Sequence, residues 1–439
     1  MYRTRFAPSP TGFLHIGGLR TAAYAYALAK HNHGQFLLRI EDTDQKREIE
    51  GATQKIFNTL KNFGLNWDET PVIQSERTQS GEYTKFVKLL LDSDHAFYCQ
   101  CEGRNAKTEG YSQILRDPCR DKNLSSGAVK LKVPDNNTVS YKDYVLDKQI
   151  SWNTNDVPDT TLLKSDGFPT YHLAVVIDDH FMRITHALRG HDWLPSTPIH
   201  LLIYDYLQFP RIEIGHLTDI QSPRGGKLSK RQDSVSCEQF IDAGYLPEAL
   251  LNFVILLGWA PKDNRELFTL PEFVEAFDPF GFQKSNPLFT YDKLNWFNGQ
   301  YIRQKSDSEL LELLKPYAKN SLDPKIVNLV KDRLVKLSDY DTLTSFFSTP
   351  PQLNPSLFND PHNSLNHLTF ALNNLSNISN LTDQIKTEGF KVGDFFMSLR
   401  IAICGSRFTP PITEVMEIIG KHETIKRINL VIEKLKIKN

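Results

Sequence analysis

The beginning of the chain alternates twice between a short strand-like segment and a longer segment with helical spacing of apolar residues. Residues 2–7 and 36–40 are short and apolar, as in strands, whereas residues 19–32 and 49–63 carry apolar side chains at helical intervals. Gly34 is the expected end of the first helix, because glycine readily adopts the left-handed conformation found after helices. Strands that alternate with helices predict a parallel α/β sheet, whose ligands lie beyond the carboxyl ends of the strands.

A change of pattern after residue 98 predicts an insertion into this sheet. From residue 99 to 155 the segments become shorter and more polar, with strand-like stretches at 129–133 and 139–145. Strand-like character returns at residues 171–178 and 183–189, and a helix is expected near residues 197–207.

The last two hundred residues are mostly helical in pattern and show no fixed-period repeat. Examples of the helices expected there are 247–259, 307–317, 324–337 and 412–419. The basic segment 421–439 is interpreted as a solvated helix face, because a charge run alone is weak evidence for nucleic-acid binding.

Size and composition restrict the location and the class of the protein. A length of 439 residues predicts two to four domains. No apolar run reaches the eighteen or so residues of a membrane helix, and no signal-peptide pattern is present, so a cytoplasmic protein without a membrane partner is expected. The five cysteines are few for this length, which favours a reducing compartment in which they are thiols or metal ligands. The net charge of −1 gives no support to nucleic-acid binding by the chain as a whole.

The turn after the first strand contains residue types that suit a phosphate group. Two glycines let a ligand approach the backbone, the N-terminus of the following helix offers N–H groups, and a histidine can donate a hydrogen bond. Taken alone, a His-Ile-Gly-Gly segment is more often a turn than a site. The residues of this turn are Pro8, Thr11, Gly12, His15, Gly17 and Gly18.

A second loop, more than two hundred residues later, is strongly basic and begins with two glycines. Its sequence is Gly225-Gly226-Lys227-Leu228-Ser229-Lys230-Arg231. Its cations can close over a triphosphate and stabilise the negative charge that builds up on the α-phosphate and the departing pyrophosphate. Taken alone, such a loop is at least as often a solvated basic turn.

The two loops, in this order and separated by a long insertion, resemble the signature elements of class I aminoacyl-tRNA synthetases. Gly18 and Leu228 depart from the general pattern of that class in the way that its glutamyl branch does. Val175 and His191-Asp192, by contrast, differ from residues that other members carry. Further segments that resemble the bacterial glutamyl enzymes are 39–44, 169–174, 184–190, 247–252, 257–259, 393–396 and 399–402.

The resemblance to bacterial-type glutamyl-tRNA synthetases implies a multidomain α/β fold. A Rossmann-type parallel sheet would be split by an inserted α+β subdomain and followed by a mostly α-helical anticodon-binding region. The implied domains are residues 1–98 and 167–240 for the two halves of the catalytic domain, 99–166 for the acceptor-end insert, 241–305 for a helical stem-contact domain, and 306–439 for the anticodon domain.

The resemblance also assigns a role to individual residues. Arginines suit the carboxylates of glutamate, and an acid suits its ammonium group. The implied catalytic residues are His15, Lys227 and Lys230. The implied ATP-binding residues are Pro8, Thr11, Gly12, His15, Gly17, Gly18, Trp193, Lys227, Leu228, Ser229, Lys230 and Arg231. The implied glutamate pocket is Arg5, Ala7, Ser9, Glu41, Tyr171 and Arg189, with Arg189 facing the side-chain carboxylate, and the implied acceptor-end residues are Thr43, Asp44 and Arg47.

The reaction that the resemblance implies has two steps. The α-carboxylate of glutamate attacks the α-phosphate of ATP, with Mg²⁺ on the phosphates, and a ribose 2′-hydroxyl of the terminal adenosine of tRNA(Glu) then attacks the mixed anhydride. A carboxylate is already a nucleophile at neutral pH, so catalysis consists of positioning and charge stabilisation. The family also implies that tRNA binds before glutamate is activated, and that the enzyme is a monomer.

A group of cysteines near the start of the insertion resembles a zinc knuckle that some glutamyl enzymes have and others lack. Cys99, Cys101 and Cys119, with Asp121 as the fourth donor, would suit tetrahedral Zn²⁺, and Tyr111 or a water molecule is the alternative to Asp121. Ordinary reduced cysteines are the competing interpretation.

Three other readings of the chain remain as alternatives. A glutamine-specific ligase would lack arginine at the position of Arg189 and carry β-barrels at its C-terminal end, and a truncated paralogue would stop near residue 300. A non-catalytic tRNA-binding relative would have no need of His15, Lys227 and Lys230 together. The residues do not distinguish an enzyme that charges only tRNA(Glu) from one that also charges tRNA(Gln).

Overall fold

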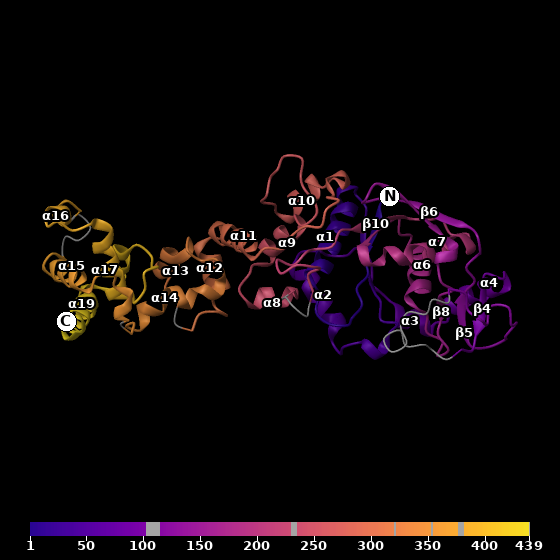
Figure 1. Ribbon diagram of the computed structural model, residues 1–439, viewed down its shortest axis with the longest axis horizontal. Helices are drawn as coiled ribbons and strands as arrows, with labels where there is room; N and C mark the ends of the chain where they lie inside the picture. The colour runs from indigo at the N-terminus through magenta and orange to yellow at the C-terminus, as the bar shows by residue number, and fades with distance from the viewer. Residues whose placement is uncertain (102–114, 230–234, 320–321, 353, 376–381, 439) are drawn as a thin grey trace. The chain divides into compact units, whose positions relative to one another are not determined.

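The computed structural model describes residues 1–439 except 102–114, 230–234, 320–321, 353, 376–381 and 439 (Figure 1). The chain divides into two compact units. The first comprises residues 1–241 and 247–293, and the second comprises 242–246 and 294–439. The α/β fold class with a helical C-terminal region, predicted from the sequence, is confirmed.

A five-stranded parallel sheet forms the centre of the first unit. Its strand order is β10-β9-β1-β2-β3, and each neighbouring pair is parallel. The predicted first two strands lie side by side in it, with Arg5 opposite Leu37. Because β1 and β9 are neighbours, residues that follow the first strand meet residues from near position 190 at the same sheet edge. The strands are β1 (Arg3–Phe6), β2 (Gln35–Ile40), β3 (Val72–Ile73), β9 (His186–Gly190) and β10 (Glu213–Leu217).

Helix α1 (Ile16–His31) connects β1 to β2 and is buried over most of its surface. Its small alanines allow close packing against the sheet on one side and against α9 and α10 on the other. The predicted end of this helix before Gly34 is confirmed, and the residue with the positive φ of 52° that follows the helix is His33. Gly34 is needed for a different reason: a Cβ there would lie 2.0 Å from the carbonyl oxygen of Tyr2.

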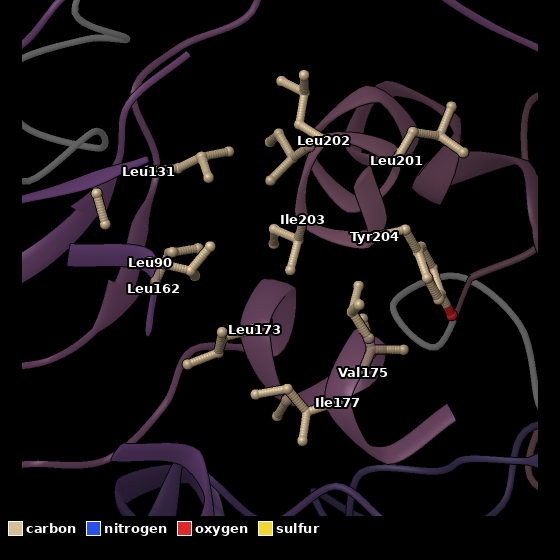
Figure 2. Close-up of a cluster of buried hydrophobic side chains, with 14 of the residues drawn as sticks. Leu90, Leu131, Leu162, Leu173, Val175, Ile177, Leu201, Leu202, Ile203 and Tyr204 are labelled. Carbon is tan, nitrogen blue, oxygen red and sulfur yellow. The ribbon is translucent and has the colours of Figure 1, made fainter. Parts of the chain in front are cut away.

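Residues 171–178, predicted as a strand, form most of a helix, α6 (Tyr171–Phe181). The run Leu173 to Ile177 is buried on all sides, so it lacks the polar face that usually reveals a helix, and its β-branched residues imitate a strand. Figure 2 shows Leu173, Val175 and Ile177 of α6 packed with residues of α7 (Thr197–Tyr206) in one apolar cluster. Val175 is therefore a core residue.

The described residues of the insertion form two small antiparallel sheets, which β4 enters from just before residue 99. The predicted strands at 129–133 and 139–145 are present as β5 and β6, with slightly earlier ends. Leu131 of β5 and Leu162 of β8 join the apolar cluster of α6 and α7, so the insertion and the catalytic sheet share a core (Figure 2). The strands are β4 (Ala96–Cys99), β5 (Ala128–Leu131) and β8 (Thr161–Leu163) in one sheet, and β6 (Thr138–Asp143) and β7 (Lys148–Asn153) in the other.

The remaining helices of the first unit surround the sheet and its insertion. The predicted helix at 49–63 begins later and ends where expected, before Gly64, which has a φ of 75°. The predicted helix at 247–259 ends earlier, at Ile255. These helices are α2 (Ala52–Asn62), α3 (Gln74–Gln79), α4 (Glu82–Asp92), α8 (Cys237–Asp242), α9 (Pro247–Ile255) and α10 (Leu270–Ala276), with short 3₁₀ turns at Gln45–Arg47, Thr154–Asp156, His191–Ser196 and Pro279–Gly281.

The second unit is helical throughout its described residues. Its helices have clear start signals, such as the capping box in which Ser306 Oγ accepts from Glu309 N. The predicted helices at 307–317 and 324–337 end earlier, and the one at 412–419 matches. The helices are α11 (Tyr291–Gln304), α12 (Asp307–Leu314), α13 (Pro324–Lys331), α14 (Tyr340–Ser348), α15 (Pro361–Asn373), α16 (Thr382–Thr387), α17 (Val392–Cys404), α18 (Ile412–Ile419) and α19 (Lys421–Lys438), with 3₁₀ turns at Leu337–Asp339 and Pro355–Leu357. A search of the described helices finds no segment that has both the length and the apolar character of a membrane span.

Candidate active site

One cavity of about 240 Å³ lies at the carboxyl edge of the parallel sheet. All six residues predicted for the glutamate pocket line it, although they come from three strand ends and one helix start. The role of each as a glutamate ligand is still a prediction, but the fold brings them together as that prediction requires. The lining residues are Arg5, Phe6, Ala7, Ser9, Thr21, Glu41, Tyr171, Leu188, Arg189, Gly190 and Trp193.

A buried network of charges reaches this cavity through two of its members, Arg5 and Glu41. Asp179 lies between two arginines: its Oδ1 is 3.1 Å from Arg5 Nε and 2.7 Å from Arg39 Nη1. Arg39 also contacts Glu41, at 3.1 Å, and Asp178, at 3.8 Å. The positive charges of Arg5 and Arg39 are thus matched by carboxylates of the protein itself.

The charge state of this network follows from its pairing. Burial alone would raise the pKa of Asp179, but Arg5 and Arg39 lower it below its ordinary value. For Glu41 burial prevails and raises the pKa, although Arg39 and Arg5 oppose the rise. The two arginines therefore do not fully offset the cost of burying the Glu41 carboxylate. A positively charged group of a ligand beside Glu41 would favour the ionised carboxylate.

Arg189 is the second arginine that lines the cavity. Arg189 is 7% exposed, and among the described residues no carboxylate lies within ion-pair distance of its guanidinium. Its Nη1 lies 3.0 Å from His200 Nδ1 and 3.4 Å from the hydroxyl oxygen of Tyr171, whereas its Nε is buried without a partner. A buried guanidinium with an unused donor is strongly suited to bind an anion that enters the cavity.

His15 caps the N-terminus of α1, at the end of the predicted phosphate-binding turn. The backbone N–H of Gly17 donates to His15 Nδ1 over 2.9 Å. Because Nδ1 accepts a hydrogen bond, the proton of the neutral ring is on Nε2, the ring nitrogen that can donate. The first turn of α1 contains no acidic residue, so the positive end of the helix dipole is not masked by its own side chains.

The backbone joins this turn to the segment that follows the basic loop. Ile16 N donates to Val235 O over 2.9 Å, and Cys237 N donates to Leu14 O over 2.9 Å. His15 and Ser236 form an antiparallel bridge between the same two segments. Two motifs that are more than two hundred residues apart in the sequence are therefore held side by side at their ends.

The first half of the basic loop is a tight hairpin. Gly225 and Gly226 have φ values of 93° and 74°, which side-chain-bearing residues rarely adopt, and Ser222 N donates to Gly226 O over 2.9 Å. Lys227 Nζ contacts the carboxylates of Asp192 and Asp219. Leu228 is buried and Ser229 half-buried, whereas the predicted Lys230 and Arg231 lie outside the described residues.

A second cavity, of about 760 Å³, adjoins the first and shares Ser9, Glu41, Tyr171 and Trp193 with it. The three residues predicted for the tRNA acceptor end, Thr43, Asp44 and Arg47, all line this second cavity. The rings of Trp193 and Tyr171 are in tilted contact, with 4.3 Å between their centroids and 40° between their planes, and both residues line both cavities. The insertion also contributes here, because Lys164 Nζ donates to Thr43 O over 3.1 Å.

The predicted metal donors gather in the insertion, with one correction. Ligand atoms of Cys99, Cys101, Cys119 and Asp117 all lie within 4.8 Å of one another. Asp121, predicted as the fourth donor, is exposed and does not belong to this group, and the alternative Tyr111 lies outside the described residues. Asp117 takes that place because it precedes Cys119 by two residues and accepts from its backbone N over 2.8 Å.

The donor set combines two kinds of thiol. Burial, first of all, raises the pKa of Cys99 to about 12, whereas the pKa of Cys119 is lowered, first by a hydrogen bond from the backbone of Gln100. The Sγ atoms of Cys101 and Cys119 are 3.4 Å apart, and Cys99 Sγ is 3.3 Å from Asp117 Oδ2. These spacings are close to those between ligands of one tetrahedral zinc ion.

Several residues of the site escaped the sequence analysis. Asp178, Asp179, His172 and His200 were assigned no role, although they border the pocket residues. A signal was present for the aspartates, because two adjacent acids directly after the apolar run 173–177 are unusual in a buried element.

Comparison with families of known proteins covers both units. The family described as tRNA synthetases class I (E and Q), catalytic domain, matches residues 1–296. The family described as anticodon binding domain matches residues 309–432.

Individual relatives match the chain over almost its whole length. A glutamate–tRNA ligase of Treponema denticola is 36% identical and covers 97% of this chain and 98% of its own, and one of Clostridium tetani is 37% identical over 99% and 98%. The crystal structure of a glutamate tRNA ligase from Elizabethkingia meningosepticum in complex with its amino acid has a TM-score of 0.85 and 31% identity, and covers 99% of both chains.

Proposed function

The chain belongs to the bacterial glutamate–tRNA ligases of the class I tRNA synthetase family, and we propose that its cavity at the sheet edge binds glutamate for activation by ATP. The observation that carries this proposal is Arg189, a buried guanidinium without an acidic partner among the described residues of the cavity. The side-chain carboxylate of glutamate would supply the missing negative charge, through the charge-assisted hydrogen bonds that arginine forms best.

The rest of the cavity suits the other charged groups of glutamate. Glu41, whose pKa burial raises, would regain a cationic neighbour in the ammonium group of the substrate. Arg5 already pairs with Asp179, so it adds a positive potential near the α-carboxylate without being an unmatched charge. The cavity therefore offers positive charge to the carboxylates of glutamate and negative charge to its ammonium group. This arrangement would hold the amino acid in a single orientation.

ATP would bind at the N-terminus of α1. The turn with His15, Gly17 and Gly18 offers backbone N–H groups, the helix dipole and an imidazole donor to phosphate oxygens. Lys227, now held by Asp192 and Asp219, would turn to the phosphates, and Lys230 and Arg231 are proposed partners there. Bound Mg²⁺ would neutralise part of the triphosphate charge.

The proposed activation of glutamate needs no catalytic base, because a carboxylate is already a nucleophile at neutral pH. The α-carboxylate of glutamate attacks the α-phosphate, pyrophosphate leaves, and the residues of the two loops hold the groups in line and stabilise the developing charge. The terminal adenosine of tRNA would then enter the second cavity beside Thr43, Asp44 and Arg47. Its 2′-hydroxyl would attack the carbonyl carbon of the mixed anhydride, so that the bond to phosphate breaks and AMP leaves with the hydroxyl proton. We further propose the five domains named above, a monomeric state and a cytoplasmic location.

Removal of one phosphate-binding cation tests this function. Lys227→Ala should lower the rate of tRNA glutamylation about 100-fold, because it removes charge stabilisation from the transition state. Binding of the tRNA, measured by filter retention, should stay within about twofold, since one distant contact supplies little of the total affinity. The matched control is Lys262→Ala, a lysine of the same unit whose side chain is 87% exposed.

The tRNA glutamylation assay also identifies the substrates of the enzyme. The rate should require ATP, glutamate and tRNA(Glu) together, and purified tRNA(Gln) offered under the same conditions reports whether this enzyme is discriminating. Equal loss of tRNA binding and of charging in Lys227→Ala would favour a tRNA-binding protein over a ligase.

Zinc fits the thiol group of the insertion, and we propose that Cys99, Cys101, Cys119 and Asp117 hold one Zn²⁺. Three thiolates and one carboxylate are a suitable tetrahedral set, and all four ligand atoms already lie within 4.8 Å of one another. The proposed role is structural, because β4 and the loop around Cys119 would be tied together at the base of the insertion. Lys130, 2.5 Å from Asp117 Oδ2, would balance the charge of the ligands.

Metal analysis tests this site. Freshly purified protein should contain about one zinc per chain, and Cys119→Ser should contain far less, because the loss of a thiolate typically lowers affinity by at least tenfold. Cys404→Ala, which removes a buried cysteine of the second unit, should keep its zinc. A wild-type content far below one zinc per chain, in protein purified without chelators, would reject the site.

A further inference from the structure

The cavity contains a second layer of residues behind Arg189 that the proposed chemistry does not use. His200, on α7, is 1% exposed, and its Nδ1 lies 3.0 Å from Arg189 Nη1. Its Nε2 lies 3.2 Å from Nδ1 of His172, on α6. A guanidinium, an imidazole and a second imidazole thus form a chain that leads away from the cavity.

The hydrogen bonds determine the protonation of both rings. A guanidinium can only donate, so His200 Nδ1 must accept and cannot carry a proton. The proton of His200 is then on Nε2, which donates to His172 Nδ1, so that nitrogen is unprotonated as well. Burial, followed by the charge of Arg189, lowers the pKa of His200 well below its ordinary value, and that of His172 to about 4. Both rings are neutral at physiological pH.

Arg5 shows how a guanidinium of this cavity is held by an acid instead of by a histidine. Arg5 is held in the same cavity by Asp179, a carboxylate, which orients the guanidinium and also cancels its charge. His200 orients Arg189 without cancelling its charge. The unit positive charge of Arg189 is therefore available to a ligand, and a substrate with a neutral side chain would leave it buried without a counterion.

We propose that His200 is a specificity-determining residue, which makes the cavity select a side-chain carboxylate over the isosteric carboxamide by holding Arg189 with a neutral acceptor. His200 acts through Arg189 and does not touch the substrate, so it is a positioning residue. This inference rests on the proposed binding of glutamate beside Arg189. It concerns the choice between glutamate and glutamine, whose side chains have nearly the same shape but end in a charged carboxylate and a neutral carboxamide.

A pair of isosteric variants separates charge from shape. His200→Asn keeps a neutral acceptor at a position close to Nδ1, and His200→Asp places a carboxylate of the same shape there. Relative to His200→Asn, His200→Asp should lower kcat/KM for glutamate at least about 100-fold, chiefly through KM, because Arg189 would then be neutralised from within. The kcat/KM for glutamine should not fall, so the glutamate-to-glutamine ratio should decrease by a similar factor. His200→Asn itself should keep glutamate charging within about tenfold of wild type.

The controls exclude a general effect of the substitution. His33, exposed and distant from the cavity, provides the matched pair His33→Asn and His33→Asp, for which the ratio should not change. If His200→Asp does not fold, His200→Gln and His200→Glu repeat the comparison with one more methylene. A merely structural role would lower activity with both substrates equally and leave the ratio unchanged.

A measurement on the wild-type enzyme is independent of any variant. Long-range ¹H–¹⁵N spectra of histidine-labelled protein, with His200→Asn for assignment, should show an unprotonated Nδ1 and a protonated Nε2 for His200 between pH 6 and 8. A doubly protonated ring in this range, or equal ratios in the Asn and Asp variants, would overturn the inference. If wild-type protein did not charge tRNA with glutamate at all, the proposed function would fail instead, so the two failures are distinguishable.

Discussion

Replacement of Arg189 by alanine is expected to lower kcat/KM for glutamate about 10²- to 10³-fold. The guanidinium is buried and has no acidic partner among the described residues, so the substrate carboxylate would be its counterion. The loss of one member of a buried, hydrogen-bonded charge pair costs roughly 2–5 kcal/mol, and each 1.4 kcal/mol corresponds to about a factor of ten. The measurement is aminoacylation of tRNA(Glu) with labelled glutamate over a range of glutamate concentrations.

The substitution Arg189→Ala should impair the use of glutamate and not the use of ATP. The KM for ATP should change little, because Arg189 lies in the wall of the first cavity and not in the turn before α1. Arg211→Ala is the matched control, since Arg211 pairs with Asp205 at the surface and such pairs contribute about 0–1 kcal/mol. An unchanged Michaelis constant and turnover number for glutamate in Arg189→Ala would refute the assignment of the pocket.

The substitution Asp179→Asn is expected to destabilise the first unit by about 3–5 kcal/mol. It leaves Arg5 and Arg39 buried with one counterion fewer, and breaking a buried pair by removing one partner carries a cost of about this size. Asp205→Asn, which breaks only the surface pair with Arg211, should cost less than about 1 kcal/mol.

Urea unfolding, followed by tryptophan fluorescence, measures the free energy of unfolding of the first unit. Four of the five tryptophans, Trp67, Trp152, Trp193 and Trp259, lie in the first unit. Because Arg5 and Arg39 lower the pKa of Asp179, its stabilising effect is fully present above the ordinary aspartate value and disappears as the pH falls through the lowered pKa. The difference between wild type and variant should thus persist down to about pH 4. Equal midpoints for Asp179→Asn and Asp205→Asn would contradict the role of the network.

Predictions that depend on local pattern agree well with the structure. The strand, turn and helix of residues 2–32, the second strand and helix, the insertion and the helical C-terminal region are all present. These elements are predicted from the spacing of apolar residues and from the positions of glycine and proline. Each of these signals spans only a few residues of the sequence.

The errors share a physical cause. Residues 171–178 were predicted as a strand because a helix that is buried on every side loses its polar face, and only its packing against α4, α7 and β8 shows what covers it. Asp121 was chosen over Asp117 because spacing alone cannot show which carboxylate of a loop turns toward the thiols. Helix ends at 259, 317 and 337 were placed too late, since periodicity continues beyond the last hydrogen-bonded turn.

From the sequence alone, the resemblance of its motifs to a known family predicted that family, two loops for phosphate and six pocket residues, and these six residues line one cavity of the structure. Only the tertiary structure decided which of the arginines has no acid beside it among the described residues. That distinction arises because α6 brings Asp179 to Arg5 whereas α7 brings His200 to Arg189, and the sequence places these partners 174 and 11 residues apart. Charge compensation is a property of neighbours in space, and a chain acquires such neighbours only when it folds.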